Sequence, residues 1–297
     1  MASSAYSDFD VIAQEERVRD EIAASSELVS DPLPTSVLLD EYKENKDAFR
    51  DKLKDVTSKY DSFRRVRGDG NCFYRAFGFA LLQQILHRGT EEQARKLYQQ
   101  AVASKALLVA QGYTEYTIED FYDSYVEVIA LATGFPKPPA AYDYSTGIPV
   151  PVQQDANSEP PKQLPWPLTA QERALRESNL LAIFRDDPVA SAVVYYLRLL
   201  TAGHFKTNAE FFQGFIEDGL TVSEFCAREV EVMARECEQV HIVALSAALD
   251  VPVRVVYTDS SDSTSQATEI NFQEEGTAAP TVSLLYRPGH YDILYAR

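Results

Sequence analysis

Residues 67–77 read Arg67-Gly68-Asp69-Gly70-Asn71-Cys72-Phe73-Tyr74-Arg75-Ala76-Phe77. Two glycines flank an aspartate, and the apolar residues that follow Cys72 recur at the spacing of a buried helix. Asn71 is a favourable N-cap residue, so the pattern predicts a helix that begins at Cys72. The stretch therefore places a thiol in the first turn of a core helix.

A thiol at this position is suited to nucleophilic chemistry. The partial positive charge at a helix N-terminus favours a thiolate over a thiol. The glycines let the backbone turn sharply, so that N–H groups of Asp69, Gly70, Asn71 and Cys72 are candidates for an oxyanion hole. A single cysteine heading an apolar helix is, however, more often an inert core residue. This stretch alone leaves both interpretations open.

A second stretch changes that balance. Residues 284–295 read Leu284-Leu285-Tyr286-Arg287-Pro288-Gly289-His290-Tyr291-Asp292-Ile293-Leu294-Tyr295. Pro followed by Gly suits a tight turn, which predicts two short strands joined as a hairpin. Because side chains alternate along a strand, His290 and Asp292 should share one face. A carboxylate beside an imidazole can orient it, which completes a nucleophile, base and orienter in Cys72, His290 and Asp292.

Together these stretches resemble the ovarian-tumour (OTU) class of deubiquitinating cysteine proteases, and specifically its otubain branch. The segment at 286–295 within the second stretch carries the resemblance, and three further segments do so as well, at 210–216, 224–231 and 251–257. The resemblance implies an α+β, papain-like OTU fold in which a helical lobe packs on a small, mainly antiparallel sheet. It also places Asp69 in the catalytic constellation with Cys72, His290 and Asp292, and it implies that no cofactor or metal is needed.

The resemblance implies a ubiquitin thioesterase and isopeptidase that cleaves ubiquitin–lysine bonds, with ubiquitin and polyubiquitin chains as partners. One alternative is a non-catalytic binding protein that restrains ubiquitin-conjugating enzymes without using its thiol. Another is a papain-like peptidase or acyltransferase with a different substrate. The sequence leaves these alternatives open, because chain preference depends on surfaces that no local motif reveals.

Composition limits the other classes of function. The chain has 297 residues, of which 45% are hydrophobic and 25% charged, as in an ordinary globular protein. A net charge of −17 argues against nucleic-acid binding, which requires clustered Lys and Arg. We expect no membrane span, because no apolar stretch is long enough. Three widely spaced cysteines and an acidic N-terminus without a secretory signal predict a cytoplasmic or nuclear protein.

The chain is predicted to divide into an N-terminal helical arm at 1–62 and a catalytic domain at 63–297. Apolar stripes at 8–24 and 38–60 predict helices in the arm, which by resemblance would hold a proximal ubiquitin or a conjugating enzyme. Nine of the 15 prolines lie at 136–167, which predicts a loop-like insertion at about 135–167. Helices are expected at 91–111, 117–132, 169–185, 187–200 and 238–249, with further starts at Asn208 and Thr221, and strands at 252–257 and 270–272.

The remaining cysteines and histidines are weaker candidates. Cys226 and Cys237 fall in helical patterns with no glycine or cap beside them, so we expect ordinary core or surface thiols. His87, His204 and His241 have no partner at metal-ligand spacing, which argues against a zinc site.

Overall fold

The computed structural model describes residues 26–137, 166–217, 219–259, 265–272 and 281–297, and the backbone alone of 142–143 and 148–149. The predicted helix at 8–24 and most of the predicted Pro-rich insertion therefore lie outside the described residues. Within the insertion, β3 (Tyr142–Asp143) pairs with β4 (Ile148–Pro149) in antiparallel orientation.

A six-stranded sheet forms the centre of the molecule, in the order β1-β2-β8-β7-β5-β6. Only the pairing of β5 with β7 is parallel, so the prediction of a mainly antiparallel sheet is confirmed. The strands are β1 (Leu33–Pro34), β2 (Tyr60–Arg64), β5 (Val253–Tyr257), β6 (Thr268–Phe272), β7 (Val282–Arg287) and β8 (His290–Ala296).

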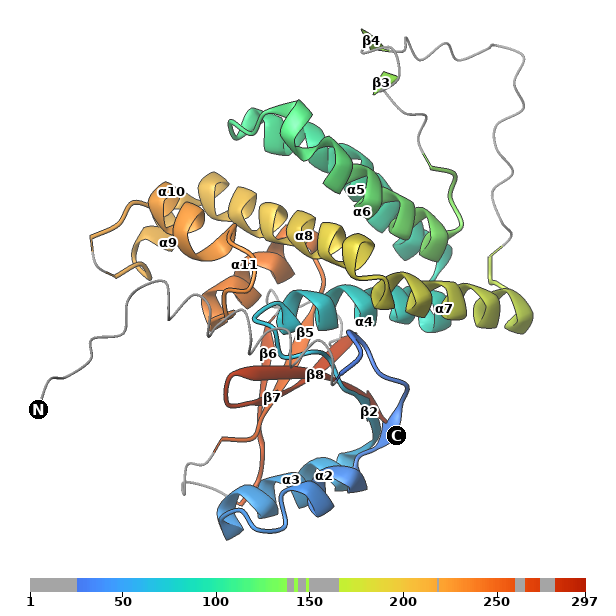
Figure 1. The fold of residues 1–297 in the computed structure, drawn as a ribbon, viewed down its shortest axis with the longest axis vertical. Coiled ribbons are helices and arrows are strands. Elements are labelled where there is room, and N and C mark those ends of the chain that lie inside the picture. The colour runs from blue at the N-terminus through green and yellow to red at the C-terminus, as the bar shows by residue number, and fades with distance from the viewer. Residues whose placement is uncertain are drawn as a thin grey trace, which may run out of the picture.

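Both faces of this sheet are covered by helices (Figure 1). In β8, Tyr291 and Ile293 point into the core shared with the helical lobe, whereas Leu294 points into a smaller core on the other face. That smaller core is closed by α2 (Ser36–Glu41) and α3 (Asp47–Lys59). Side chains of β8 thus alternate between two hydrophobic cores, one on each face of the sheet, because successive side chains of a strand point to opposite faces.

The apolar stripe at 38–60, predicted as one helix, forms two helices and leads directly into β2. Residues 33–64 therefore supply two strands to the same sheet that carries His290. The division of the chain into an arm at 1–62 and a catalytic domain stays a prediction.

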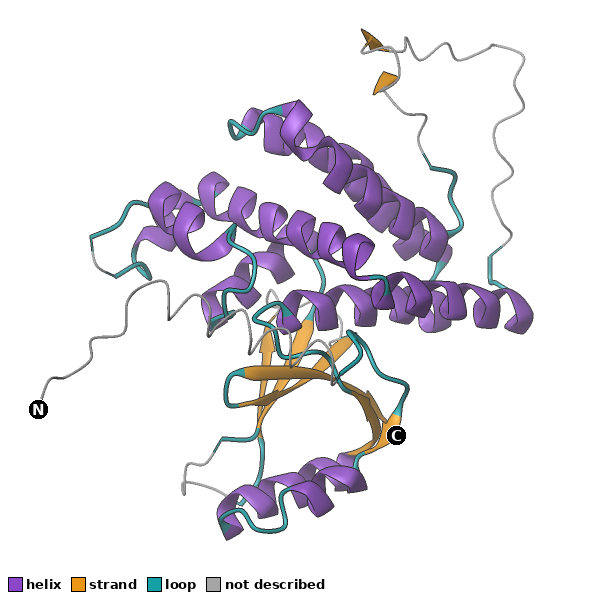
Figure 2. Cartoon of the chain, viewed as in Figure 1, coloured by secondary structure: helices purple, strands orange, loops and turns teal. Residues whose placement is uncertain are grey.

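The opposite face of the sheet carries the helical lobe, drawn in purple above the orange strands in Figure 2. α4 lies at its centre, because β7 and β8 pack on one side of it and α6, α7 and α8 on others. The lobe consists of α4 (Cys72–Arg88), α5 (Glu91–Ala110), α6 (Glu115–Thr133), α7 (Ala170–Arg185), α8 (Asp187–Thr207), α9 (Ala209–Gln213), α10 (Val222–Phe225), the π-helical turn η1 (Cys226–Val230) and α11 (Gln239–Leu249).

Helix starts follow local capping chemistry. Thr169 and Thr221 begin α7 and α10 with complete capping boxes to Glu172 and Glu224, as Thr-x-x-Glu predicts. One predicted start is wrong. The helix expected from Thr117 begins two residues earlier, at Glu115, with Thr114 as its N-cap residue, and Thr117 donates its hydroxyl to the Thr114 carbonyl. α8 begins at Asp187, as expected for the helix at 187–200, and its N-cap residue is Asp186, which accepts from the Val189 N–H.

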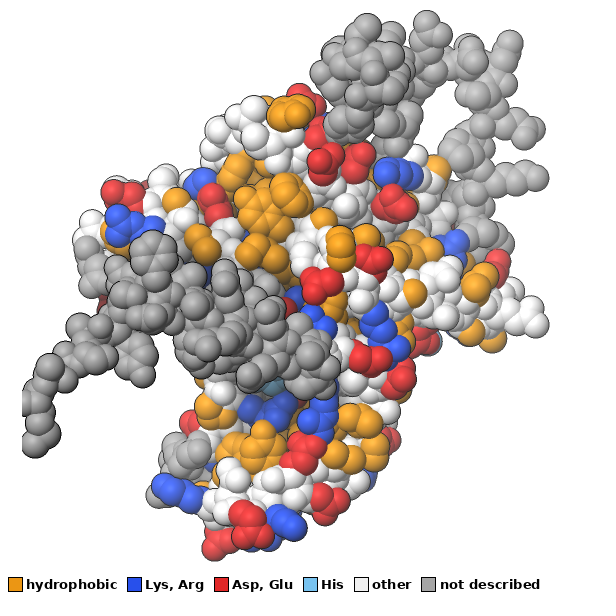
Figure 3. All heavy atoms as spheres, viewed as in Figure 1, with side chains coloured by type: hydrophobic (Ala, Val, Ile, Leu, Met, Phe, Trp, Pro, Cys, Tyr) orange, Lys and Arg blue, Asp and Glu red, His pale blue; other side chains and the backbone are white. Residues whose placement is uncertain are grey.

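The surface is charged and mixed. On the face seen in Figure 3, acidic and basic side chains are interspersed over the helical lobe and over the α2–α3 layer. No helix in the described part of the chain combines the length and apolarity that a bilayer crossing requires.

Candidate active site

The first residues of strand β8 provide an imidazole–carboxylate pair. His290 Nε2 lies 2.9 Å from Asp292 Oδ1, and the Asp292 side chain is fully buried. Alternation along the strand places both side chains on one face, as predicted. Because Nε2 is engaged by the carboxylate, Nδ1 is the ring nitrogen that remains for another partner.

The thiol of Cys72 also interacts with His290 and contributes to the pKa of the ring. Cys72 is buried and opens α4, while His290 begins β8, so a nucleophile and a base from opposite ends of the domain come together where these two elements start. Burial alone would lower the pKa of His290, but the hydrogen bonds and charges of Asp292 and Cys72 raise it from 6.5 to about 9. The ring is therefore an imidazolium at neutral pH.

Gly68 explains how the imidazole fits at this position. A Cβ atom on Gly68 would lie 3.3 Å from His290 Nδ1, which is tighter than an ordinary contact. The first glycine of the loop thus leaves room for the ring. Its role is to allow close approach of the base.

Asp292 is itself fixed by two other donors. The Val66 N–H donates to Oδ1 over 3.0 Å, and Arg287 Nη2 donates to Oδ2. Burial raises the pKa of Asp292, but the hydrogen bond from His290 and the charge of Arg287 outweigh it and leave the pKa below its ordinary range. Asp292 is therefore a carboxylate that faces two cations.

Arg287 was not among the predicted site residues. Its signal was available in the hairpin, since the strand register places Arg287 directly opposite His290. Arg287 Nη1 donates to the hydroxyl of Tyr42 over 2.6 Å, and Tyr42 follows α2 on the far side of the sheet.

Asp69 binds a different partner from the one expected of a catalytic acid. Its carboxylate accepts two hydrogen bonds from Arg75, at 2.9 and 2.8 Å, and one from the Asn71 N–H at 3.0 Å. The Asp69 side chain therefore takes up the Asn71 N–H, which is one of the four candidate oxyanion donors. The N–H groups of Asp69, Gly70 and Cys72 remain candidates, and that of Cys72 belongs to the first helical turn, whose amides have no intrahelical acceptor.

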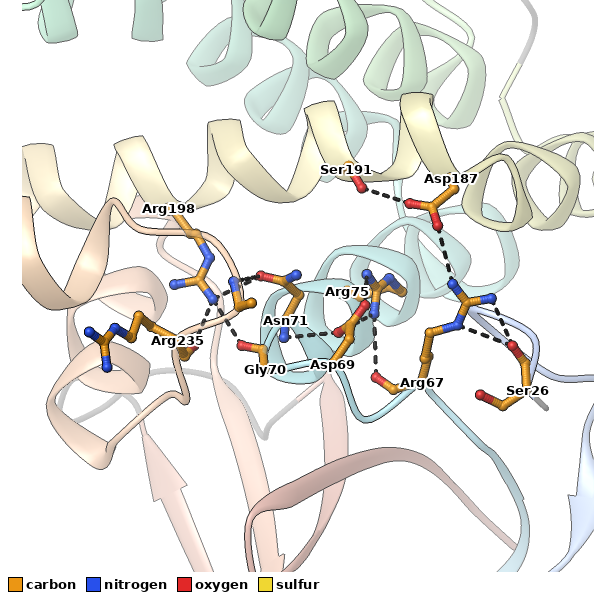
Figure 4. Close-up of polar contacts among 11 residues, drawn as sticks. Ser26, Arg67, Asp69, Gly70, Asn71, Arg75, Asp187, Ser191, Arg198 and Arg235 are labelled. Carbon is orange, nitrogen blue, oxygen red and sulfur yellow. Dashed lines mark hydrogen bonds and ion pairs between the residues drawn. The ribbon is translucent and has the colours of Figure 1, made fainter. Parts of the chain in front are cut away.

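Asn71 occupies the N-cap position of α4, as predicted, but its side chain does not cap the helix. Asn71 Oδ1 instead accepts from Arg198 Nη2 at 3.0 Å and from the Ala234 N–H at 2.9 Å. Figure 4 shows these groups converging on the loop from α8 and from the segment after η1. Asn71 therefore links the nucleophile loop to residues more than 120 positions away.

Gly70 is required by packing as well as by backbone conformation. Its φ is +75°, and a Cβ atom there would lie 2.2 Å from the Ala234 carbonyl oxygen. No side chain fits at this position without displacement of the segment at 231–237.

The other two cysteines differ from Cys72. Cys226 is fully buried in η1, and burial raises the pKa of its thiol to about 12. Cys237 lies in an irregular segment between η1 and α11, so the predicted helical position was wrong. Burial raises the pKa of the Cys237 thiol well above its ordinary value, and the charge of Cys72 acts in the same direction. Of the three cysteines, Cys72 is the one whose thiol interacts with His290.

The weaker histidine candidates have ordinary surroundings. His87 pairs with Glu177 at 2.9 Å, and burial lowers the pKa values of His204 and His241.

The sequence matches the protein family described as Peptidase C65 Otubain over residues 21–134 and 154–296. Ubiquitin thioesterase OTUB1 from Homo sapiens is 39% identical over 285 residues, which cover 96% of this chain and 89% of that protein. Ubiquitin thioesterase OTUB2 from Homo sapiens is 30% identical and covers 92% of this chain and 97% of its own. The OVARIAN TUMOR DOMAIN-containing deubiquitinating enzyme 1 of Arabidopsis thaliana is 33% identical, with 94% and 84% covered.

Solved structures give the same result for the fold. The structure of h/ceOTUB1 with ubiquitin aldehyde and UBCH5B~Ub aligns with a TM-score of 0.77 at 27% identity, covering 98% of each chain. The corresponding complex with UBC13~Ub aligns with a TM-score of 0.77 at 28% identity, again over 98% of each chain. The predicted α+β OTU fold is confirmed, and the chain belongs to the otubain family, Peptidase C65.

Proposed function

We propose that this chain is a cysteine-type deubiquitinase that hydrolyses thioester and isopeptide bonds at the C-terminus of ubiquitin, including those within polyubiquitin. The family match and the relatives named as ubiquitin thioesterases support the substrate class. The single observation that carries the chemistry is His290, which is hydrogen-bonded to Asp292 and interacts with the thiol of Cys72. This interaction joins a base to a nucleophile at a helix N-terminus.

The residues act in sequence in the proposed reaction. The imidazolium of His290 stabilises the Cys72 thiolate, which attacks the carbonyl carbon of the terminal glycine of ubiquitin. The resulting oxyanion receives hydrogen bonds from loop amides, with Asp69, Gly70 and Cys72 as the candidates. His290 then donates its proton to the departing lysine amine as the C–N bond breaks. Water, deprotonated by His290, attacks the thioester and releases ubiquitin and the Cys72 thiol.

Capture by an electrophilic ubiquitin tests this proposal. Ubiquitin that carries an activated vinyl electrophile, such as a vinyl sulfone, at its C-terminus should form a covalent adduct with the full chain. Mass spectrometry should locate this adduct on Cys72. Cys72→Ala should abolish the adduct, whereas the matched change Cys226→Ala, in a thiol with a raised pKa, should leave adduct formation intact if the protein folds. An adduct on Cys226 or Cys237, or none on the folded wild type, would contradict the proposal.

A second proposed function is binding to a ubiquitin-conjugating enzyme charged with ubiquitin. The two solved structures that align over 98% of this chain are complexes of their own chains with UBCH5B~Ub and UBC13~Ub. In the Cys72→Ala variant, restraint of ubiquitin transfer by such an enzyme should persist while chain cleavage is lost. Unchanged transfer rates at saturating concentrations of the folded variant would rule this function out.

A further inference from the structure

Arg198 is a fully buried arginine that binds the nucleophile loop from α8. Its Nη2 donates to the Gly70 carbonyl at 2.9 Å, to Asn71 Oδ1 at 3.0 Å and to the Arg235 carbonyl at 2.7 Å. Its Nη1 donates to the Val230 carbonyl at 3.1 Å, and the side chain has 0% exposed surface. One guanidinium therefore joins the loop before Cys72 to the segment after η1 (Figure 4).

The charge of Arg198 has no carboxylate partner within the described residues, because all four of its acceptors are neutral oxygens. The guanidinium also lies 4.4 Å from the centre of the Tyr74 ring, which offers only a weak counter-charge. Burying an ion without a counter-ion costs more free energy than burying an apolar side chain of the same size. The neighbours of Arg198 on α8, such as Leu197 and Leu199, are buried and apolar. An apolar side chain would therefore suit the packing at position 198, so packing alone does not explain the arginine.

We propose that Arg198 is a positioning residue for the reaction, which fixes the loop at Gly70 and Asn71 and holds its positive charge against the two residues that precede Cys72. This inference rests on the proposed deubiquitinase function. The loop carries the three remaining oxyanion candidates, and its shape is fixed on one side by Asp69 with Arg75 and on the other by Arg198. The same cation would stabilise negative charge first on the thiolate and then on the oxyanion.

The charge of Arg198 contributes to the pKa values of neighbouring groups. Burial lowers the pKa of His241 to about 4, and the positive charge of Arg198 acts in the same direction. Burial lowers the pKa of Arg198 itself, whereas Tyr74, Cys237, Asp69 and Cys72 oppose that shift. The charged and titratable groups around the loop and the guanidinium are Asp69, Cys72, Tyr74 and Arg75 from the loop and α4, Cys237 from the segment after η1, His241 from α11, and His290 and Asp292 from β8.

Alkylation of Cys72 separates the charge from the geometry. The rate of Cys72 carboxamidomethylation by iodoacetamide, followed by peptide mass spectrometry from pH 4 to 10, gives the midpoint of thiolate formation without any ubiquitin. In Arg198→Gln, which lacks the charge, we expect this midpoint to rise by about 1 pH unit. Arg198→Lys keeps the positive charge but loses the planar guanidinium that reaches several acceptors at once. In this variant the midpoint should stay within about 0.3 pH unit of the wild-type value, while kcat for di-ubiquitin cleavage falls roughly 100-fold.

A matched control is Arg176→Lys, since Arg176 also donates to a backbone carbonyl, that of Leu131, but between α7 and α6. It should change neither the alkylation midpoint nor kcat. An unshifted midpoint in folded Arg198→Gln overturns the electrostatic role, and an unchanged kcat in Arg198→Lys overturns the positioning role. If Arg198→Gln does not fold, kcat in Arg198→Lys decides the positioning role, and Arg198→Met, which also removes the charge, decides the electrostatic role through the same alkylation midpoint. Failure of wild type to react with electrophilic ubiquitin, by contrast, would contradict the proposed function and leave the alkylation result standing.

Discussion

The Tyr42 hydroxyl lies 2.6 Å from Nη1 of Arg287, and the other terminal nitrogen of the same guanidinium donates to Asp292. The contact crosses from the segment after α2 to the hairpin that carries His290. The α2–α3 layer therefore does more than cover the sheet, because it supports the arginine that keeps Asp292 ionised. The orientation of His290 therefore depends, through Asp292 and Arg287, on the α2–α3 layer on the other face of the sheet.

The first prediction concerns Arg287. In Arg287→Met, Asp292 loses a donor and a positive charge, so its lowered pKa should rise. A carboxyl with a lowered folded pKa stabilises the protein above its unfolded pKa of about 4, and this contribution is lost as pH falls through the folded pKa. The midpoint of acid unfolding should therefore move to higher pH, and kcat at pH 7 should fall roughly 100-fold. Circular dichroism during acid titration and di-ubiquitin cleavage measure the two effects.

Arg254→Met is the matched control for this change, because Arg254 lies on the same sheet but pairs with Glu269 and Asn271. Arg254→Met should leave the midpoint of acid unfolding and kcat at pH 7 near those of wild type. Equal losses in the two variants would contradict a specific link between Arg287 and Asp292.

The second prediction concerns the ionisation of His290. Its pKa of about 9 in the folded state is raised from 6.5, so the stabilisation it provides is fully present below about 6.5 and disappears as pH rises through about 9. Nitrogen-15 NMR of labelled histidines should show a ring that titrates near pH 9 and, in Cys72→Ala, at a lower pH, because one hydrogen-bond partner and its charge are gone. The same midpoint in both proteins would show that Cys72 does not interact with the ring.

The third prediction compares two glycines with positive φ. Gly70→Ala adds both backbone strain and a clash with the Ala234 carbonyl, whereas Gly112 has a φ of +95° and nothing within 4 Å of an added Cβ. Gly112→Ala should therefore cost about 1 kcal/mol of unfolding free energy and Gly70→Ala about 3 kcal/mol or more. Urea unfolding measures both. Equal costs would mean that the segment at 231–237 moves aside freely.

The fourth prediction concerns Gly68, where an added Cβ would press on His290 Nδ1 at 3.3 Å. Gly68→Ala should displace the imidazole from Cys72 and lower kcat by between about tenfold and 100-fold, with little change in the melting temperature. The control Gly214→Ala, where the nearest atom is 3.8 Å away, should leave kcat unchanged. Full activity in Gly68→Ala would show that the ring has room to shift without loss.

Features that depend on a few adjacent residues could be predicted from the sequence. The helix start at Thr221 and the turn at Pro288 and Gly289 were correct, because all the interacting groups lie within a few positions. The geometry also brings Cys72, His290 and Asp292 together, which needed only the helix start, the strand period and the order of the motifs.

The errors and omissions involve partners that are distant in sequence. Asn71 was interpreted as a helix cap, but its side chain is taken by Arg198 and Ala234. Arg198 lies 128 residues from Gly70, and only a charged residue within an apolar helix hinted at its role. Cys237 was placed in a helix because its apolar spacing continued past η1, where the backbone in fact becomes irregular.

The position of β8 between β2 and β7 ties the order of the site to the order of the sheet. This seven-residue strand carries both His290 and Asp292, and it pairs with β2 on one side and with β7 on the other. Because the imidazole and its carboxylate lie on a strand that is paired on both sides, a large displacement of the strand requires the loss of backbone hydrogen bonds to its neighbours.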